Sequence, residues 1–186
     1  MANRFRRQKT LTVLELRGTL LVIPGIILML LPFPWNETVG KALDAAGYFL
    51  VALGLFDLHE KNVGFGSADW AAFFALVMTV MGFFTHTGIL GELIPLAIYC
   101  FVLYFMCTSF AQLANLLHDH DMAHHFLHHM VIDIVATVIE IIVHALELHT
   151  LGYIAMAVAI YCEAVLMLCM YRFYKKYNRV AVERTA

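Results

Sequence analysis

The sequence predicts an all-α membrane protein with six transmembrane helices, arranged as three antiparallel helical hairpins. Three observations lead to this fold class: the composition, the length of the apolar runs and the distribution of the basic residues. The chain of 186 residues is 62% hydrophobic and only 14% charged, with a mean hydropathy of +0.78. Soluble globular proteins carry roughly 25% charged residues. We therefore expect the lipid bilayer to be the first partner of this chain.

Six apolar runs approach or exceed the roughly 18–20 residues that cross the core of a bilayer. These runs are Leu16–Pro34, Ala42–Leu58, Trp70–Thr85, Ile89–Leu117, Val131–Leu148 and Leu151–Tyr171. Hydrocarbon offers no water to the backbone N–H and C=O groups, so each run is expected to be a helix. The short links THTG and LHTLG predict that the third and fourth runs, and the fifth and sixth, are antiparallel pairs.

The basic residues predict the orientation in the membrane. Of the 12 Lys and Arg residues, 11 are expected on the side of the bilayer that also holds both chain ends, and Lys41 is expected on the other side. Basic residues are enriched on the cytoplasmic side of membrane proteins. We therefore expect an inner (plasma) membrane protein with both termini in the cytoplasm. Residues 1–15 form a basic N-terminus, residues 16–174 the transmembrane domain and residues 175–186 a basic tail.

Small residues recur at seven-residue intervals in the first two runs. Gly18 and Gly25 mark the first run, and Gly47 and Gly54 mark the second. Seven residues are close to two helical turns, so each pair lines one face of a helix. Because lipid supplies no hydrophobic force between helices, such small faces favour close contact between backbones.

The second helices of the expected hairpins resemble one another. The motif AIYC occurs twice, and each copy is followed by a further cysteine seven residues after its own; Tyr48 aligns with Tyr99 and Tyr161 of the two copies. We therefore expect three copies of one αα-hairpin. The four cysteines lack CxxC spacing and lie in apolar runs, which predicts neither a disulfide framework nor a thiolate zinc site.

The stretches LRGTLLVIPGIILMLLPFPW and AAGYFLVALGLFDL resemble the HdeD-type acid-resistance membrane proteins. The resemblance is clearest over residues 16–58. It implies a small bacterial inner-membrane protein of six helices in three hairpins, with a role in stress or in the cell envelope. It implies no catalytic residue, and we expect that the protein is not an enzyme.

A histidine cluster lies between the fourth and fifth runs. Six of the ten histidines fall in HDHDMAHHFLHH, residues 118–129. Imidazole gains charge between about pH 5 and 7, and neutral imidazole binds transition metals. This cytoplasmic connection is therefore expected to be a pH-sensitive polar link, a metal-binding segment or a proton-responsive switch.

A polar ridge continues from the cluster along the fifth run. Its members are spaced four and three residues apart, which places them on one face of a helix. They are Asp133, Thr137, Glu140, His144 and Glu147, and a helix extended backwards adds His129, His125 and His118. We expect this face to look towards protein or water, and the connection itself to continue the helix.

Ionisable groups in the middle of a span are costly, at about 2.5–3.5 kcal/mol each on insertion scales. Glu140 and Glu163 therefore need a proton, a hydrogen bond or a bound cation. The candidates for a proton-responsive group or pathway are Glu140, Glu147 and Glu163. A hydrogen-bonded seam between helices is the alternative explanation of the ridge.

Histidine and carboxylate pairs at i, i+4 present two ligands to one divalent metal ion, such as zinc. The candidate metal ligands are His118, Asp121, His125, His128, His129, Asp133, Glu140 and His144. The identity of the metal is left open by these residue types.

Three functions remain open. The preferred one is an HdeD-like stress or envelope protein, whose histidine cluster and acidic fifth helix respond to protons or divalent metal. The alternative is a minimal metal or proton transporter, because six spans, a His-rich link and His129 four residues before Asp133 resemble the cation diffusion facilitators. The second run, however, offers only Asp44 and Asp57 near its ends. The third is a structural subunit of a membrane complex or a homo-oligomer; no nucleic-acid motif is present.

Overall fold

The fold consists mainly of helices that follow one another along the chain. The computed structural model describes residues 9–30, 37–61, 65–82, 88–146, 149–179 and 181–185. In chain order the elements are β1 (Lys9–Val13), α1 (Thr19–Leu30), α2 (Glu37–Lys61), α3 (Gly66–Gly82), α4 (Gly88–Leu116), α5 (His120–Ala145), α6 (His149–Tyr177) and β2 (Ala181–Thr185). The prediction of a helical fold is confirmed for the six apolar runs, and the two short strands are an addition to it.

Four of the helices are long and apolar enough to cross a membrane. The candidate spans are Thr38–Glu60, Ala97–Leu116, His120–Val143 and Leu151–Tyr177. Over the residues that the structure describes, α1 and α3 are also apolar but shorter, at 12 and 17 residues. Each of the six predicted runs thus corresponds to a helix, and four of these helices have the length of a span.

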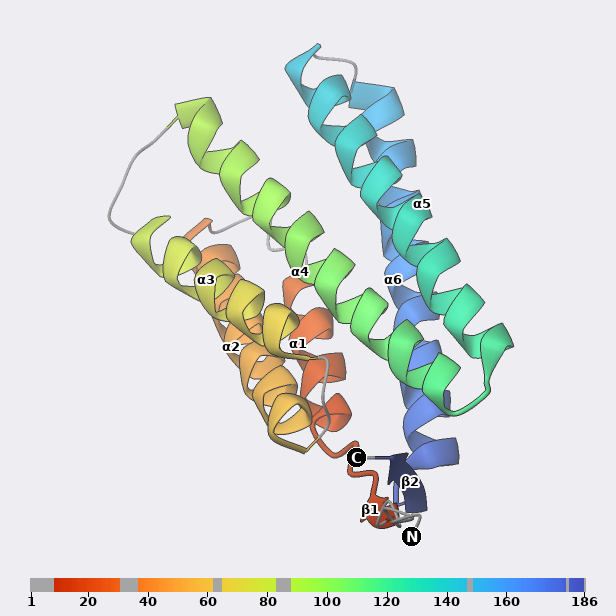
Figure 1. The fold of residues 1–186 in the computed structure, drawn as a ribbon. Helices are drawn as coiled ribbons and strands as arrows, with labels where there is room; N and C mark the ends of the chain where they lie inside the picture. The colour runs from red at the N-terminus through yellow and green to blue at the C-terminus, as the bar shows by residue number, and fades with distance from the viewer. Residues whose placement is uncertain are drawn as a thin grey trace, which may run out of the picture.

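The helices form a continuous bundle. Each helix packs against its neighbours in the chain, and α1 also packs against α6. Packing of α2 against α3, and of α4 against α5, accompanies the packing within the three expected pairs. Figure 1 shows the two strands, the start of α1, the break between α4 and α5 and the end of α6 at the same end of the molecule.

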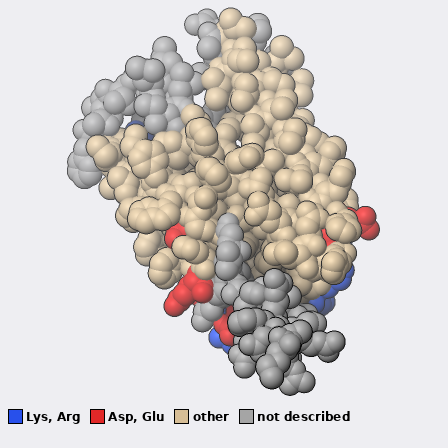
Figure 2. Space-filling view, viewed as in Figure 1, with Lys and Arg blue, Asp and Glu red and all other residues tan. Residues whose placement is uncertain are grey.

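The outer surface of the bundle is apolar over much of its length. On α5, for example, Val131, Val135 and Ile142 are each about half exposed. Figure 2 shows one face of the molecule, on which most of the visible charged side chains lie near the end that carries the strands. Such a surface suits lipid chains around the middle of the bundle and water at its ends.

Glycines bring α1 and α2 into close contact. A Cβ atom on Gly25 would lie 2.8 Å from the carbonyl oxygen of Gly47, and a Cβ atom on Gly47 would lie 2.7 Å from that of Gly25. Gly18 and Gly54 face each other in the same way, and a Cβ atom on Gly54 would lie 2.5 Å from the Gly18 oxygen. The prediction that the seven-residue spacing marks a contact face is confirmed.

The two ends of the chain are joined to each other. Strands β1 and β2 pair antiparallel along their whole length. Beside them, the Leu16 N–H donates to Asn178 Oδ1 at 3.1 Å, and the Arg179 N–H donates to the Leu14 carbonyl at 2.8 Å. The two segments that the sequence suggested were basic tails thus pair with each other.

The break between α4 and α5 is a short, capped turn. The Asp119 N–H donates to the Ala114 carbonyl at 2.9 Å, with His118 in the left-handed conformation at a φ of 59°. The Asp119 side chain then accepts a hydrogen bond from the Met122 N–H at 3.2 Å, which caps the start of α5. Most of the histidine cluster is therefore helical, because α5 begins at His120. This agrees with the expectation that the connection before the fifth run continues the helix of that run.

Candidate functional site: a buried carboxylate pair

Two buried carboxyl groups face the same interior from α5 and α6. Asp133 of α5 is 0% exposed, and Glu163 of α6 is 7% exposed. The two groups lie close enough to act on each other electrostatically. The sequence predicts Asp133 as a metal ligand and Glu163 as a member of a proton pathway. The packing of α5 on α6 brings the two residues together.

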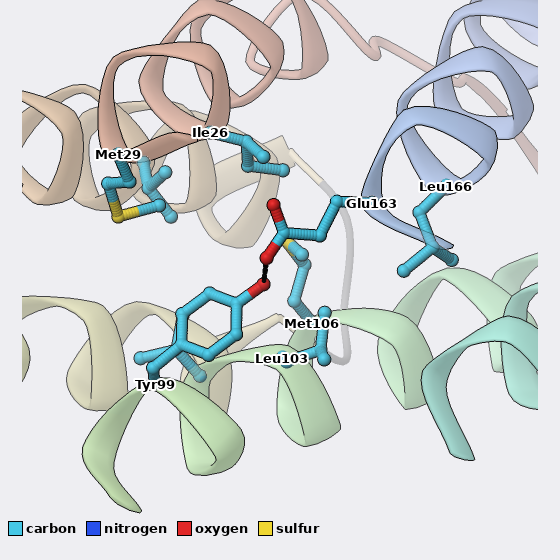
Figure 3. Close-up of a pocket in the computed structure, with 9 residues that line it drawn as sticks. Ile26, Met29, Tyr99, Leu103, Met106, Glu163 and Leu166 are labelled. Atoms are coloured by element: carbon cyan, nitrogen blue, oxygen red, sulfur yellow. Dashed lines mark hydrogen bonds between the residues drawn. The ribbon is translucent and has the colours of Figure 1, made fainter. Parts of the chain in front are cut away.

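Tyrosines from two further helices surround Glu163. The Tyr99 hydroxyl of α4 donates a hydrogen bond to Glu163 Oε1, and Figure 3 shows the two side chains pointing towards each other. Tyr48 of α2 is buried and lies within electrostatic range of the same carboxylate. Polar side chains from α2, α4 and α6 therefore meet in one interior region.

Asp133 differs from Glu163 in its partners. Neither of its two carboxyl oxygens has a hydrogen-bond partner among the described residues. The groups that it influences electrostatically include Tyr99, Cys107 and Cys162, none of which carries a positive charge. An ionised carboxylate without partners costs several kcal/mol in such surroundings. A proton or another cation is therefore expected to accompany Asp133.

A small cavity adjoins the Tyr99–Glu163 pair. Its walls are apolar side chains of α1, α2, α4 and α6, among them Ile26, Met106 and Leu166 (Figure 3). The cavity volume is about 10 Å³, close to the roughly 10–15 Å³ that one water molecule needs on this measure. The cavity is therefore at the lower size limit for one water molecule, and the surface that it exposes is apolar.

The polar ridge of α5 turns inward along the helix. His125 is exposed, His129 is partly exposed and Asp133 is buried, so the exposure falls over consecutive turns. The Nδ1 atom of His129 is already buried and has no hydrogen-bond partner in the described part of the chain. Thr137, the next member, is 3% exposed. The prediction that this face looks into the protein is confirmed at Asp133 and Thr137.

The remaining predicted site residues are not part of this pair. The exposed ones are His118, Asp121, His125 and His128. Glu140 and His144 lie on α5, but their side chains, and Glu147 as a whole, lie outside the described residues. Across the described ranges, no three His, Cys, Asp or Glu side chains come together as a metal site. The six candidate ligands whose side chains are described therefore do not form such a group, and Glu140 and His144 are not tested.

The repeated motif AIYC singles out Tyr99, but it does not indicate that Tyr99 binds Glu163. Tyr48 and Tyr99 point inward, whereas Tyr161 is 65% exposed. On α6 the inward positions belong instead to Cys162 and Glu163, which are 1% and 7% exposed. Tyr161 therefore aligns with the other two tyrosines in sequence but does not share their inward position. The hydrogen bond from Tyr99 to Glu163 was missed because it joins two different helices.

A charged contact lies near the end of the bundle, where α4, α5 and α6 meet. Asp119 Oδ2 accepts hydrogen bonds from Lys176 Nζ at 2.8 Å and from the Tyr177 hydroxyl at 2.7 Å. The Lys176 ammonium, together with Tyr177 and the Met122 N–H, holds the pKa of the Asp119 carboxyl below its usual range. This side chain thus caps α5 and ties it to the end of α6.

We expect the Asp119 contact to stabilise the fold at neutral pH and to weaken only in strong acid. Because the folded-state pKa of Asp119 is lowered, its contribution is complete above the unfolded-state pKa of about 3.9 and is lost as the pH falls through the folded-state pKa. The Asp119→Asn variant keeps a capping oxygen but loses the charge. Its deficit in unfolding free energy, measured in detergent micelles, should be constant from about pH 8 to 5 and shrink below about pH 4. A deficit that shrinks between pH 7 and 5 would assign the effect to histidines instead.

Long apolar helices and an apolar outer surface together define the class as a multi-pass helical membrane protein. Comparison with known proteins found no matching family model, no similar curated protein and no similar solved structure.

Proposed function

We propose that this chain is a six-span protein of the bacterial inner membrane that responds to protons, with Asp133 and Glu163 as the proton-binding groups. The observation that carries the proposal is the complete burial of Asp133, whose carboxyl oxygens lack hydrogen-bond partners over the described ranges. Ionisable residues inside membrane spans commonly belong to ion pathways and proton relays. A proton removes the charge of Asp133 without requiring any further ligand.

The order of exposure along α5 supports a route for protons to this pair. His125 is exposed near the start of α5, His129 lies one turn further in and Asp133 follows after one more turn. Imidazole takes up and releases protons near neutral pH, which suits it to proton relays. Carboxylates that interact closely exchange protons as a unit, and the hydrogen bond from Tyr99 fixes the position of one member.

Protons suit the pair better than a divalent metal does. A transporter of the cation diffusion type would use His129 and Asp133, which lie on consecutive turns of α5. Within the described part of the molecule, no group of three potential ligands includes them, whereas an enclosed zinc site, unlike an exposed one completed by water, generally uses three or four protein ligands. Metal transport is therefore the weaker of the two candidate functions.

For the cellular role, we propose an acid- or envelope-stress protein with both termini in the cytoplasm, as the HdeD-type resemblance implies. The charged end of the bundle in Figure 2, which carries strands β1 and β2, is the kind of surface that remains in water. Cells that lack the gene should survive acid less well, and wild type but not Asp133→Asn should restore survival. Unchanged survival on deletion would remove the stress role and leave the proton-binding proposal intact.

Infrared difference spectroscopy tests proton binding directly, because a protonated carboxyl group has a C=O stretching band that an ionised one lacks. At neutral pH in lipid, the wild-type protein should show this band, and Asp133→Asn should reduce it. Glu60→Gln changes an exposed carboxylate at the end of α2 and should leave the band unchanged. A band that survives unchanged in the double variant, Asp133→Asn with Glu163→Gln, would show that the pair does not carry the proton.

A further inference from the structure

Histidines recur every four residues along the first turns of α5. His120, His124 and His128 form one such series, and His125 and His129 form a second. Residues four apart on a helix lie on consecutive turns of one face, so the side chains of each series can reach one another. The first series is exposed throughout, whereas the second leads towards the buried Asp133.

The rings of His124 and His128 are arranged side by side. Their centroids are 5.7 Å apart and their planes differ by 16°, so both rings extend from the helix in the same direction. The rings of His125 and His129 are further apart, at 6.2 Å, and His129 is partly buried. His124 and His128 are both exposed. The His129 ring also lies 5.5 Å from that of His128, but it is tilted by 75° and partly buried, so the parallel and exposed pair is His124 with His128.

We propose that His124 and His128 chelate one divalent transition-metal ion, such as Zn²⁺ or Cu²⁺, on the exposed face of α5. A zinc ion binds imidazole nitrogen at about 2.0–2.1 Å, so the two nitrogens need to come within about 4 Å of each other. Modest side-chain rotations bring nearly parallel rings on consecutive turns to this separation. Imidazole nitrogens suit zinc and copper, and water or an external ligand completes the coordination.

The surroundings favour a cation at this position. The exposed carboxylate of Asp121 lies three residues before His124, on the neighbouring turn of the same face. The site is separate from the proton-binding pair, because it uses the outer face of α5 and Asp133 lies on the inner face. It also differs from the metal set expected from sequence, which omitted His124 and included Asp133.

Metal binding to the wild-type protein and to single alanine variants tests the proposal. The protein is purified without a polyhistidine tag, stripped of metal, placed in nanodiscs at pH 7.5 and titrated with Zn²⁺ in a calorimeter. Loss of one of two ligands should weaken binding at least about tenfold in His124→Ala and in His128→Ala. Both side chains are exposed, so neither change is expected to unfold the protein. Cu²⁺ added instead should show spin-resonance coupling to two imidazole nitrogens, and to one in each variant.

The controls use histidine and carboxylate positions outside the proposed chelate. His118→Ala, in the turn before α5, and His125→Ala, on the second series, should keep the wild-type affinity for Zn²⁺. Asp133→Asn should also keep it, so a failure of the proton-binding proposal is distinguishable from a failure of this one. Unchanged affinity in His124→Ala and His128→Ala would overturn the proposal. Loss of binding in Asp133→Asn would also overturn it, since the ion would then belong to the inner face.

Discussion

Replacing Gly54 with leucine is expected to separate α1 from α2 and to destabilise the whole bundle. Even the Cβ atom of an alanine at this position would lie 2.5 Å from the Gly18 carbonyl oxygen and 2.8 Å from Val22 Cγ2. The nearest of these is a backbone atom, so the helices must move apart. Inserting carbon into a packed contact costs typically 1–3 kcal/mol and sometimes more. Leucine adds three more carbons, so we expect a loss of unfolding free energy at the upper end of this range, or loss of folding. Circular dichroism during denaturant unfolding in micelles measures this loss.

Gly40 provides the matched control on the same helix. Nothing lies within 4 Å of a Cβ atom built at Gly40. Replacing a helical glycine with alanine at an open position is expected to stabilise by about 0.5–1 kcal/mol. Gly40→Ala should therefore be neutral or stabilising, and Gly54→Ala destabilising. Equal effects of the two alanine changes would show that α1 and α2 do not approach as closely as the glycine contacts indicate.

Replacing Phe110 with alanine is expected to cost about 3–5 kcal/mol, the range for removing a buried aromatic side chain. Phe110 of α4 is 0% exposed, and its ring centroid lies 5.0 Å from that of Phe65, 5.3 Å from that of Phe126 and 6.1 Å from that of Phe173. The ring thus joins α4 to α5, to α6 and to the residue that precedes α3. Its removal leaves a cavity at the meeting point of these elements, and the unfolding free energy in micelles measures the loss.

Phe101, on the same helix, separates packing from residue type. It is 61% exposed, so in a bilayer it contacts lipid. Phe101→Ala should change the unfolding free energy by less than about 0.5 kcal/mol, as surface changes usually do. If Phe101→Ala and Phe110→Ala cost the same, the aromatic contacts of Phe110 do not hold the helices together.

Features that depend on the period of one helix could be predicted from sequence. The spacing of Gly18, Gly25, Gly47 and Gly54 placed each set on one face, and only close packing makes use of such a face. The inward position of Asp133 also followed from its spacing, because a carboxylate facing lipid would be costly. In both cases the residues that must avoid lipid or allow close packing lie on the face that the helical period gives them.

Features that depend on two segments could not be predicted in the same way. The Tyr99–Glu163 bond joins α4 to α6, and nothing in either run indicates which helix the other faces. Residue similarity between apolar helices does not fix the rotation of a helix about its axis, so the repeat could not indicate which side of α6 faces inward. Strands β1 and β2 are only five residues each and lie beside basic residues. In the sequence they therefore look the same as charged tails without regular structure.

The hydrogen bond between Leu16 and Asn178 spans 162 residues of sequence, and this has a consequence for biosynthesis. At a synthesis rate of roughly 5–20 residues per second, the nascent N-terminal segment waits on the order of 10–30 s for its partner to leave the ribosome. During that interval β1 is an unpaired strand edge, which is open to proteases and to pairing with other chains. The contact between the two ends of the chain can therefore form only after the last helix has been synthesised.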